Sequence, residues 1–102
     1  MPTIRDLVLA LRLRPGVEAA IVLGRDGLVV DAATAPGFDH EVIAAHAPKA
    51  AHAASDVGRA ARWGELVTAV VEYEQGLAVL CTISADALLI VLVTPDAALG
   101  AL

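Results

Sequence analysis

The first apolar residues of the chain recur at the spacing of a helix. One face of this segment carries Ile4, Leu7, Val8 and Leu11. Thr3 stands where an N-cap residue is expected, and Asp6 follows in the position of a capping-box acid. Pro15-Gly16 ends the pattern, since neither residue favours continuing a helix. A short amphipathic helix is therefore predicted near the start of the chain.

Five later segments have the length and punctuation of β-strands. They are residues 17–23, 28–32, 66–74, 77–83 and 87–93. Turn sequences that contain Gly, Asp or Ser separate neighbouring strands at 24–27, 75–76 and 84–86. The first and last strands are apolar at almost every position, which is typical of central strands covered on both faces. The second and third strands are then left as edges, where another chain can pair.

One long helix is predicted between the second and third strands, over residues 39–62. Asp39 is a capping residue, and Glu41 in the first turn favours the positive end of the helix dipole. Pro48 lies inside the segment and removes one backbone hydrogen bond. We therefore expect either one bent helix or two pieces that meet near Ala47.

The order of elements predicts a single domain of the α/β (α+β) class over residues 1–102. It comprises a helix, two strands, the long helix, three strands and the start of a final helix at Thr94-Pro95-Asp96. We expect a five-stranded antiparallel sheet with the long helix on one face. The short N-terminal helix and the truncated C-terminal helix are expected on the other face.

The long helix carries two stripes of small or apolar residues. We assign the first to the sheet: Ile43, Ala47, Ala50, Ala54, Val57 and Ala61. The second is even smaller: Ala44, Ala51, Ser55 and Gly58. A second smooth stripe permits close approach of another helix, such as that of a twin subunit, although general alanine richness also explains it. On this assignment, a glutamate in place of Ala51 would weaken the dimer.

Composition and charge exclude several classes of partner. The chain has 12 acidic and 7 basic side chains, a net charge of −5, and its basic residues are scattered. Nucleic acids and anionic membranes require a concentrated positive face, so neither is expected as a partner. The longest apolar run, 87–93, is far shorter than the ~20 residues of a membrane span. The single cysteine, Cys81, fits a reducing compartment, so we expect a cytoplasmic protein without membrane insertion.

No residue pattern indicates a metal site or a reactive thiol. His40, His46 and His52 are six residues apart, which turns successive side chains by about 240° around a helix. Metal ligands on one helix are instead spaced by three or four residues. Cys81 lies among apolar residues of a strand, where a thiol is expected to be inert.

Catalytic and nucleotide-binding motifs are also missing from the sequence. Neither serine lies in a nucleophile elbow, and residues 24–27 lack the lysine of a phosphate loop. Glu72 and Glu74 share a strand face, but a charged edge strand explains them better than a catalytic pair. These observations favour a protein that is not an enzyme, needs no cofactor and does not itself bind GTP.

The chain resembles the Roadblock/dynein light chain family in the order of its elements and in several short segments. These segments are 16–22 leading into 26–30, 44–48, 71–76, 88–93 and 97–100. The resemblance implies a homodimer or a heterodimer with a paralogue, in which long helices pack together and third strands join. Mapped onto this chain, that interface comprises Ala44, Ala51, Ser55, Gly58, Val67, Ala69 and Val71. The family's final helix is usually longer than the one that this sequence allows.

The resemblance also implies a partner, because bacterial members of the family bind small Ras-like GTPases and can promote GTP hydrolysis. The leading hypothesis is a non-catalytic dimeric scaffold or regulator of such a GTPase. A structural or ligand-sensing adaptor subunit of a signalling complex is the alternative, and it would show an apolar pocket ringed by polar groups. An enzyme would need an acid, base or nucleophile in a perturbed setting, and the sequence offers no candidate.

Overall fold

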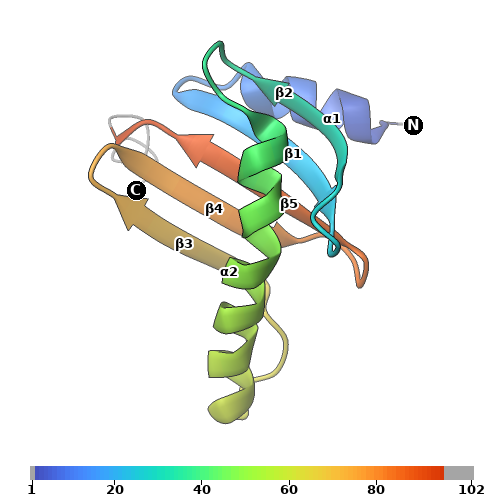
Figure 1. Cartoon of the computed structure of the whole chain (residues 1–102), viewed down its shortest axis with the longest axis vertical. Helices are drawn as coiled ribbons and strands as arrows, with labels where there is room; N and C mark the ends of the chain where they lie inside the picture. The colour runs from blue at the N-terminus through green and yellow to red at the C-terminus, as the bar shows by residue number, and fades with distance from the viewer. Residues whose placement is uncertain (1, 96–102) are drawn as a thin grey trace.

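A computed structural model describes residues 2–95 as two helices and one five-stranded sheet (Figure 1). The elements are α1 (Ile4–Arg12), β1 (Val17–Gly24), β2 (Val29–Thr34), α2 (His40–Ala60), β3 (Thr68–Tyr73), β4 (Gly76–Thr82) and β5 (Ala87–Val93). Their order confirms the predicted α-β-β-α-β-β-β arrangement. The final helix predicted from Thr94-Pro95-Asp96 falls, from Asp96 onward, outside the described residues.

The sheet has the strand order β2-β1-β5-β4-β3, and every neighbouring pair is antiparallel. The two strands that are apolar on both faces, β1 and β5, are central and pair with Ile21 opposite Ile90. The second and third strands form the two edges, as the sequence predicts. Burial of apolar side chains on both faces explains this order, because only the central strands are covered from both sides.

The two helices lie on opposite faces of the sheet, as predicted. The main core forms between α2 and one face, and it consists of Ala19, Ile21, Leu23, Ala44, Ala47, Ala51, Ala78, Leu80, Leu88 and Ile90. On the other face, Val8 of α1 packs against Ala20 and Val22 of β1. Alternate residues of β1 thus serve the two layers, because successive side chains of a strand point to opposite faces.

Local hydrogen bonds fix the start of α1 and tie the helix to the edge of the sheet. The Thr3 hydroxyl accepts from the Asp6 backbone N–H at 3.1 Å, and the Asp6 carboxylate accepts from the Thr3 N–H at 2.9 Å. This is the predicted capping box. Arg5 pairs with Asp31 at 2.9 Å and donates to the Ala32 carbonyl at 3.2 Å, so its side chain covers part of the β2 edge.

Helix α2 continues through Pro48 without a break. The Asp39 carboxylate caps it by accepting from the N–H groups of Glu41 and Val42 at 3.1 and 3.3 Å. Pro48 has no N–H to donate to the Ala44 carbonyl, and the β1–β2 turn lies against this part of the helix. A Cβ built on Gly27 would be 3.6 Å from the Ala44 oxygen and 3.8 Å from the Pro48 ring. The positive φ of 86° at Gly27 explains why the turn uses glycine there.

Gly76, the first residue of β4, is expected to tolerate no side chain. An added Cβ would lie 2.7 Å from the Val93 carbonyl oxygen, a backbone atom of the neighbouring strand. Gly76→Ala should therefore force β4 and β5 apart and cost about 1–3 kcal/mol of unfolding free energy, measured by urea denaturation.

Gly24→Ala is the matched control for Gly76→Ala. Its Cβ would approach Asp26 Oδ1 at 2.6 Å, but this atom is the end of a side chain that can rotate. This rotation breaks one hydrogen bond, from the Leu28 N–H to Asp26 Oδ1. We therefore expect the unfolding free energy to fall by about 1 kcal/mol or less. If Gly76→Ala and Gly24→Ala had the same unfolding free energy, β4 and β5 would not approach each other as closely at Gly76 as the structure shows.

Candidate interaction surface

The polar side chains singled out in the sequence lie apart in the structure. His46 and His52 are exposed, and His52 Nε2 contacts Asp56 Oδ2 at 3.5 Å. Within residues 2–95 no group of three or more His, Cys, Asp or Glu side chains could hold a metal ion. Cys81 is half-buried, with its Sγ 4.0 Å from the Thr68 hydroxyl. No helix in this part of the chain is both long enough and apolar enough to cross a membrane.

The assignment of the two stripes of α2 is corrected by the structure. Ala44, Ala51 and Ser55, which the sequence analysis assigned to a partner chain, are 0%, 1% and 5% exposed beneath the helix. Gly58 is half-buried on the same side. Conversely, Ala50, Val57 and Ala61 were assigned to the sheet, and all three are exposed. Ala47 is buried as predicted, and Ile43 and Ala54 are half-buried.

The physical reason for this exchange is the size of the side chains on the sheet. The face below α2 presents large residues, among them Ile21, Leu23 and Leu88, that fill the space between the layers. Close packing then leaves room only for the smallest stripe of the helix. Periodicity shows which residues share a helix face, but it does not show which of two apolar faces is covered.

The stripe that the sheet does not cover forms an exposed flank of α2. Ala50, Val57 and Ala61 lie within a narrow sector of the helix, because successive residues are turned by about 100°. Val57 is 70% exposed. We call Ile43, Ala50, Ala54, Val57 and Ala61 the small flank of α2. Its exposed members, Ala50, Val57 and Ala61, form an apolar surface that the sheet leaves uncovered.

At the open edge of the sheet, β3, only one of the three residues predicted at the interface is exposed. Ala69 and Val71 are half-buried against the main core, while Val67 just before the strand is exposed. The Val67 carbonyl accepts from the Thr82 N–H at 3.0 Å, so Val67 and every second residue after it direct their backbone groups to β4. The backbone groups of Thr68, Val70 and Glu72 therefore face the open edge.

Two exposed aromatic residues, one between α2 and β3 and one at the end of β3, were missed by sequence reasoning. Trp63, three residues after the end of α2, is 86% exposed, and Tyr73 at the end of β3 is also exposed. In Figure 1 the last turns of α2 extend beyond the β3 edge of the sheet. The available signal was that the only tryptophan of the chain follows the helix and precedes Gly64. Exposed tryptophan is enriched at interfaces, because its ring contributes a large contact area.

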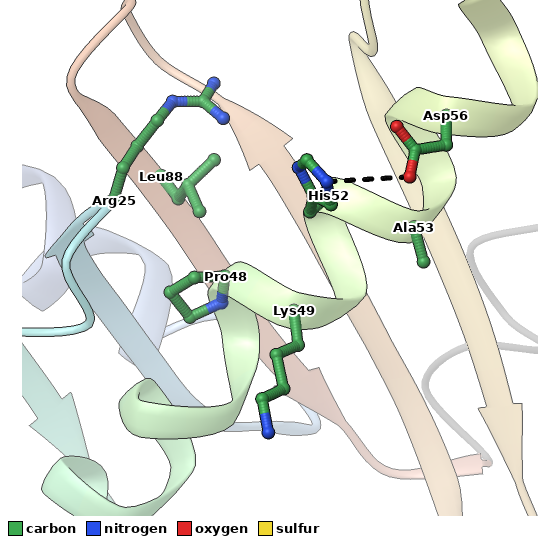
Figure 2. Close-up of a pocket in the computed structure, with 7 residues that line it drawn as sticks. All are labelled: Arg25, Pro48, Lys49, His52, Ala53, Asp56 and Leu88. Carbon is green, nitrogen blue, oxygen red and sulfur yellow. Dashed lines mark ion pairs between the residues drawn. The ribbon is translucent and has the colours of Figure 1, made fainter.

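A different surface lies along the opposite flank of α2, next to the β1–β2 turn. It is a hollow of about 530 Å³ lined by Arg25, Pro48, Lys49, His52, Ala53, Asp56 and Leu88 (Figure 2). The lining combines apolar groups with several charged side chains. This hollow was not predicted, because its residues come from three separate segments of the chain.

Comparisons with known proteins agree with this architecture. The family model of the Roadblock/LC7 domain matches residues 3–93. A crystal structure of a Roadblock/LC7 domain from Streptomyces avermitilis is 26% identical, with a TM-score of 0.81, 98% of this chain covered and 88% of the other. No curated protein sequence shows a significant match.

Two further solved structures share the fold at lower identity. The gliding protein MglB from Thermus thermophilus is 17% identical, with a TM-score of 0.80 and coverage of 93% and 73% of the two chains. MglC from Myxococcus xanthus is 21% identical, with a TM-score of 0.62 and coverage of 90% and 80%. The family match spans nearly all of the described residues, and the element order and sheet topology agree with it. The chain therefore belongs to the Roadblock/LC7 domain family.

Proposed function

We propose that the chain is a non-catalytic, dimeric regulator or scaffold that binds a small Ras-like GTPase in the cytoplasm. The observation that carries the dimer is the coincidence of an unpaired strand edge, β3, with an exposed apolar helix flank. Family membership supports the GTPase as partner, since bacterial members bind such proteins. The fold shared with the gliding protein MglB points the same way.

Pairing of β3 with β3 of a second copy has one favoured register. The outward backbone groups belong to Thr68, Val70 and Glu72, and an antiparallel pair that is symmetric about Val70 gives each of them a partner. Val70 then faces Val70 of the second copy, while Glu72 faces Thr68. This register also keeps the two Glu72 carboxylates apart, whereas like charges directly opposite would be destabilising.

The helices contribute apolar area to the same interface. The small flank of α2 is built mainly of alanine and valine, so a second helix can approach it closely. Trp63 and Val67, both exposed in the segment between α2 and β3, would add further apolar area. Burial of exposed apolar groups of this kind stabilises association by roughly 25 cal/mol per Å² before the costs of association are subtracted.

The GTPase claim is tested by titration against the Ras-like GTPases of the source organism, each loaded with GDP or with a non-hydrolysable GTP analogue. We expect one of them to bind with a clear preference for one nucleotide state, because a regulator must distinguish the two. Isothermal calorimetry measures the affinity, and single-turnover hydrolysis shows whether the rate changes. Absence of binding in both states for every GTPase would remove the claim and leave the dimer untouched.

A further inference from the structure

The hollow beside α2 is separate from the proposed dimer interface. Pro48 and His52 line it, and at about 100° per residue they lie on the other side of the helix from Ala50 and Val57. Ala53, at the rim of the hollow, is the lining residue of the helix that lies beside the small flank. Figure 2 shows Arg25 on one side of the hollow, extending from the β1–β2 turn, with Leu88 between it and His52. A ligand seated there would therefore leave the small flank free.

Arg25 is held in place by the β4–β5 turn. Its Nε–H donates to the Ala85 carbonyl at 2.8 Å, and its backbone N–H donates to the Asp86 carbonyl at 3.3 Å. The Nε position is thus occupied, and the two terminal nitrogens form the accessible end of the guanidinium. Among residues 2–95 no carboxylate lies within 4.0 Å of these nitrogens. A preorganised cation of this kind loses little conformational freedom when it binds an anion.

The charge balance of the hollow is positive although the chain as a whole is acidic. Asp56, its only carboxylate, already pairs with Arg59 at 3.0 Å and contacts His52. Lys49, on the far side of Pro48 from Arg25, has no carboxylate within 4.0 Å in the described part of the chain (Figure 2). Arg25 and Lys49 therefore remain as uncompensated cations in a chain of net charge −5.

The hollow also offers apolar contacts and adjoins a second hollow at Arg25. Pro48 and Ala53 supply its apolar surface, and Leu88, which is only 1% exposed, lies beneath it. A further hollow, which shares no lining residue with it, is lined by Asp26, Gly27, Leu28, Val29, Glu41 and Ala45. Another shares Arg25 and includes Ser55, Arg59, Glu65 and Leu66. The volume of about 530 Å³ lies in the range of ligand sites, and the adjoining hollow at Arg25 suits a chain-like ligand better than a compact one.

We propose that this hollow binds an acidic peptide segment of a partner protein. A carboxylate of the segment meets the terminal nitrogens of Arg25 end-on, a geometry that gives two parallel charge-assisted hydrogen bonds. An adjoining apolar side chain covers the half-buried Pro48, and Lys49 attracts a second acidic group. The proposal does not depend on a GTPase partner or on the dimer, because the site lies within one chain.

The test is a titration of the ¹⁵N-labelled protein with a short capped peptide of alternating leucine and glutamate. We expect amide shifts at the backbone of Arg25, Lys49, His52 and Leu88, and weaker binding as salt rises. The same peptide with glutamine in place of glutamate should bind about tenfold more weakly, because the charge-assisted bonds are lost. Equal binding of the two peptides, or shifts confined to the small flank, would overturn the proposal.

Variants of the protein separate this site from general charge attraction. Arg25→Gln should weaken the peptide about tenfold, and Arg25→Lys should restore only part of the loss, because lysine lacks the planar fork. Arg14→Gln, on an exposed arginine beyond the end of α1, removes the same charge elsewhere and should leave binding unchanged. An equal effect of Arg14→Gln and Arg25→Gln would contradict a specific site. Acetate or phosphate producing the same shifts at the same concentration would overturn the peptide assignment and reduce the hollow to a small-anion site.

Discussion

Replacing Ala51 with glutamate should unfold the chain rather than merely dissociate a dimer. Ala51 is 1% exposed and lies in the main core between α2 and the sheet. The new side chain would be too large for this space, and its charge would be buried without a partner. The expected loss is several kcal/mol, which is comparable with the whole stability of about 5–15 kcal/mol of a small domain. Circular dichroism and urea denaturation measure it.

Ala50→Glu is the matched control for Ala51→Glu, since it places the same side chain one residue earlier. Ala50 is exposed on the small flank, and a helix tolerates glutamate well. We expect this variant to stay folded with a Tm close to that of the parent, and to form a weaker dimer. A folded Ala51→Glu, or an unfolded Ala50→Glu, would show that the helix presents a different face to the sheet.

The contrast between these two positions marks how far the sequence alone can predict the fold. The apolar composition of residues 17–23 and 87–93 predicted central strands, because such segments are stable only when both faces are covered. The capping residues Thr3 and Asp39 predicted where the helices start, because their hydrogen bonds are local. In both cases the signal, an apolar run or a capping residue, is contained in a few consecutive residues, so it can be recognised in the sequence.

The covered face of α2 depends instead on a tertiary contact. Both stripes of the helix are apolar, and the choice between them follows from the bulk of Ile21 and Leu88 on the sheet, residues distant in sequence. The Arg25 hollow is a similar case. Residues 24–27 were correctly read as a turn, but the bond from Arg25 to Ala85 spans 60 residues and has no local signal. The candidate surfaces therefore required the structure, whereas the element order did not.

The two flanks of α2 divide the helix into surfaces with different chemistry. The small flank is apolar and continues toward β3, so it suits a symmetric contact with a second copy. The opposite flank carries Lys49, His52 and Asp56 beside Arg25, so it suits a charged partner of different sequence. A dimer built on the first flank would display two copies of the second. If both proposals hold, one helix serves self-association through one flank and partner binding through the other.

Proline substitutions in β3 are expected to separate edge pairing from folding. The Val70 N–H faces the open edge, so Val70→Pro removes no hydrogen bond to β4, and proline is tolerated at such edge positions. In a dimer symmetric about Val70, the substitution removes the two backbone hydrogen bonds between the Val70 residues of the two copies. The proline ring also occupies the space where the partner strand would lie. We expect the dimer to weaken about 10- to 100-fold, and analytical ultracentrifugation measures the dissociation constant.

Val71→Pro supplies the control, because the Val71 N–H belongs to the ladder with Ala78 of β4. It should cost about 3 kcal/mol of stability, whereas Val70→Pro should cost far less. Trp63 is the only tryptophan of the chain and is 86% exposed, so its fluorescence measures dimer formation independently. Its emission should shift to shorter wavelength as the parent associates and should stay constant for Val70→Pro over the same concentrations. If Val70→Pro remains as tight a dimer as the parent, the β3 edge is not the site of association, and the small flank of α2 alone must provide it.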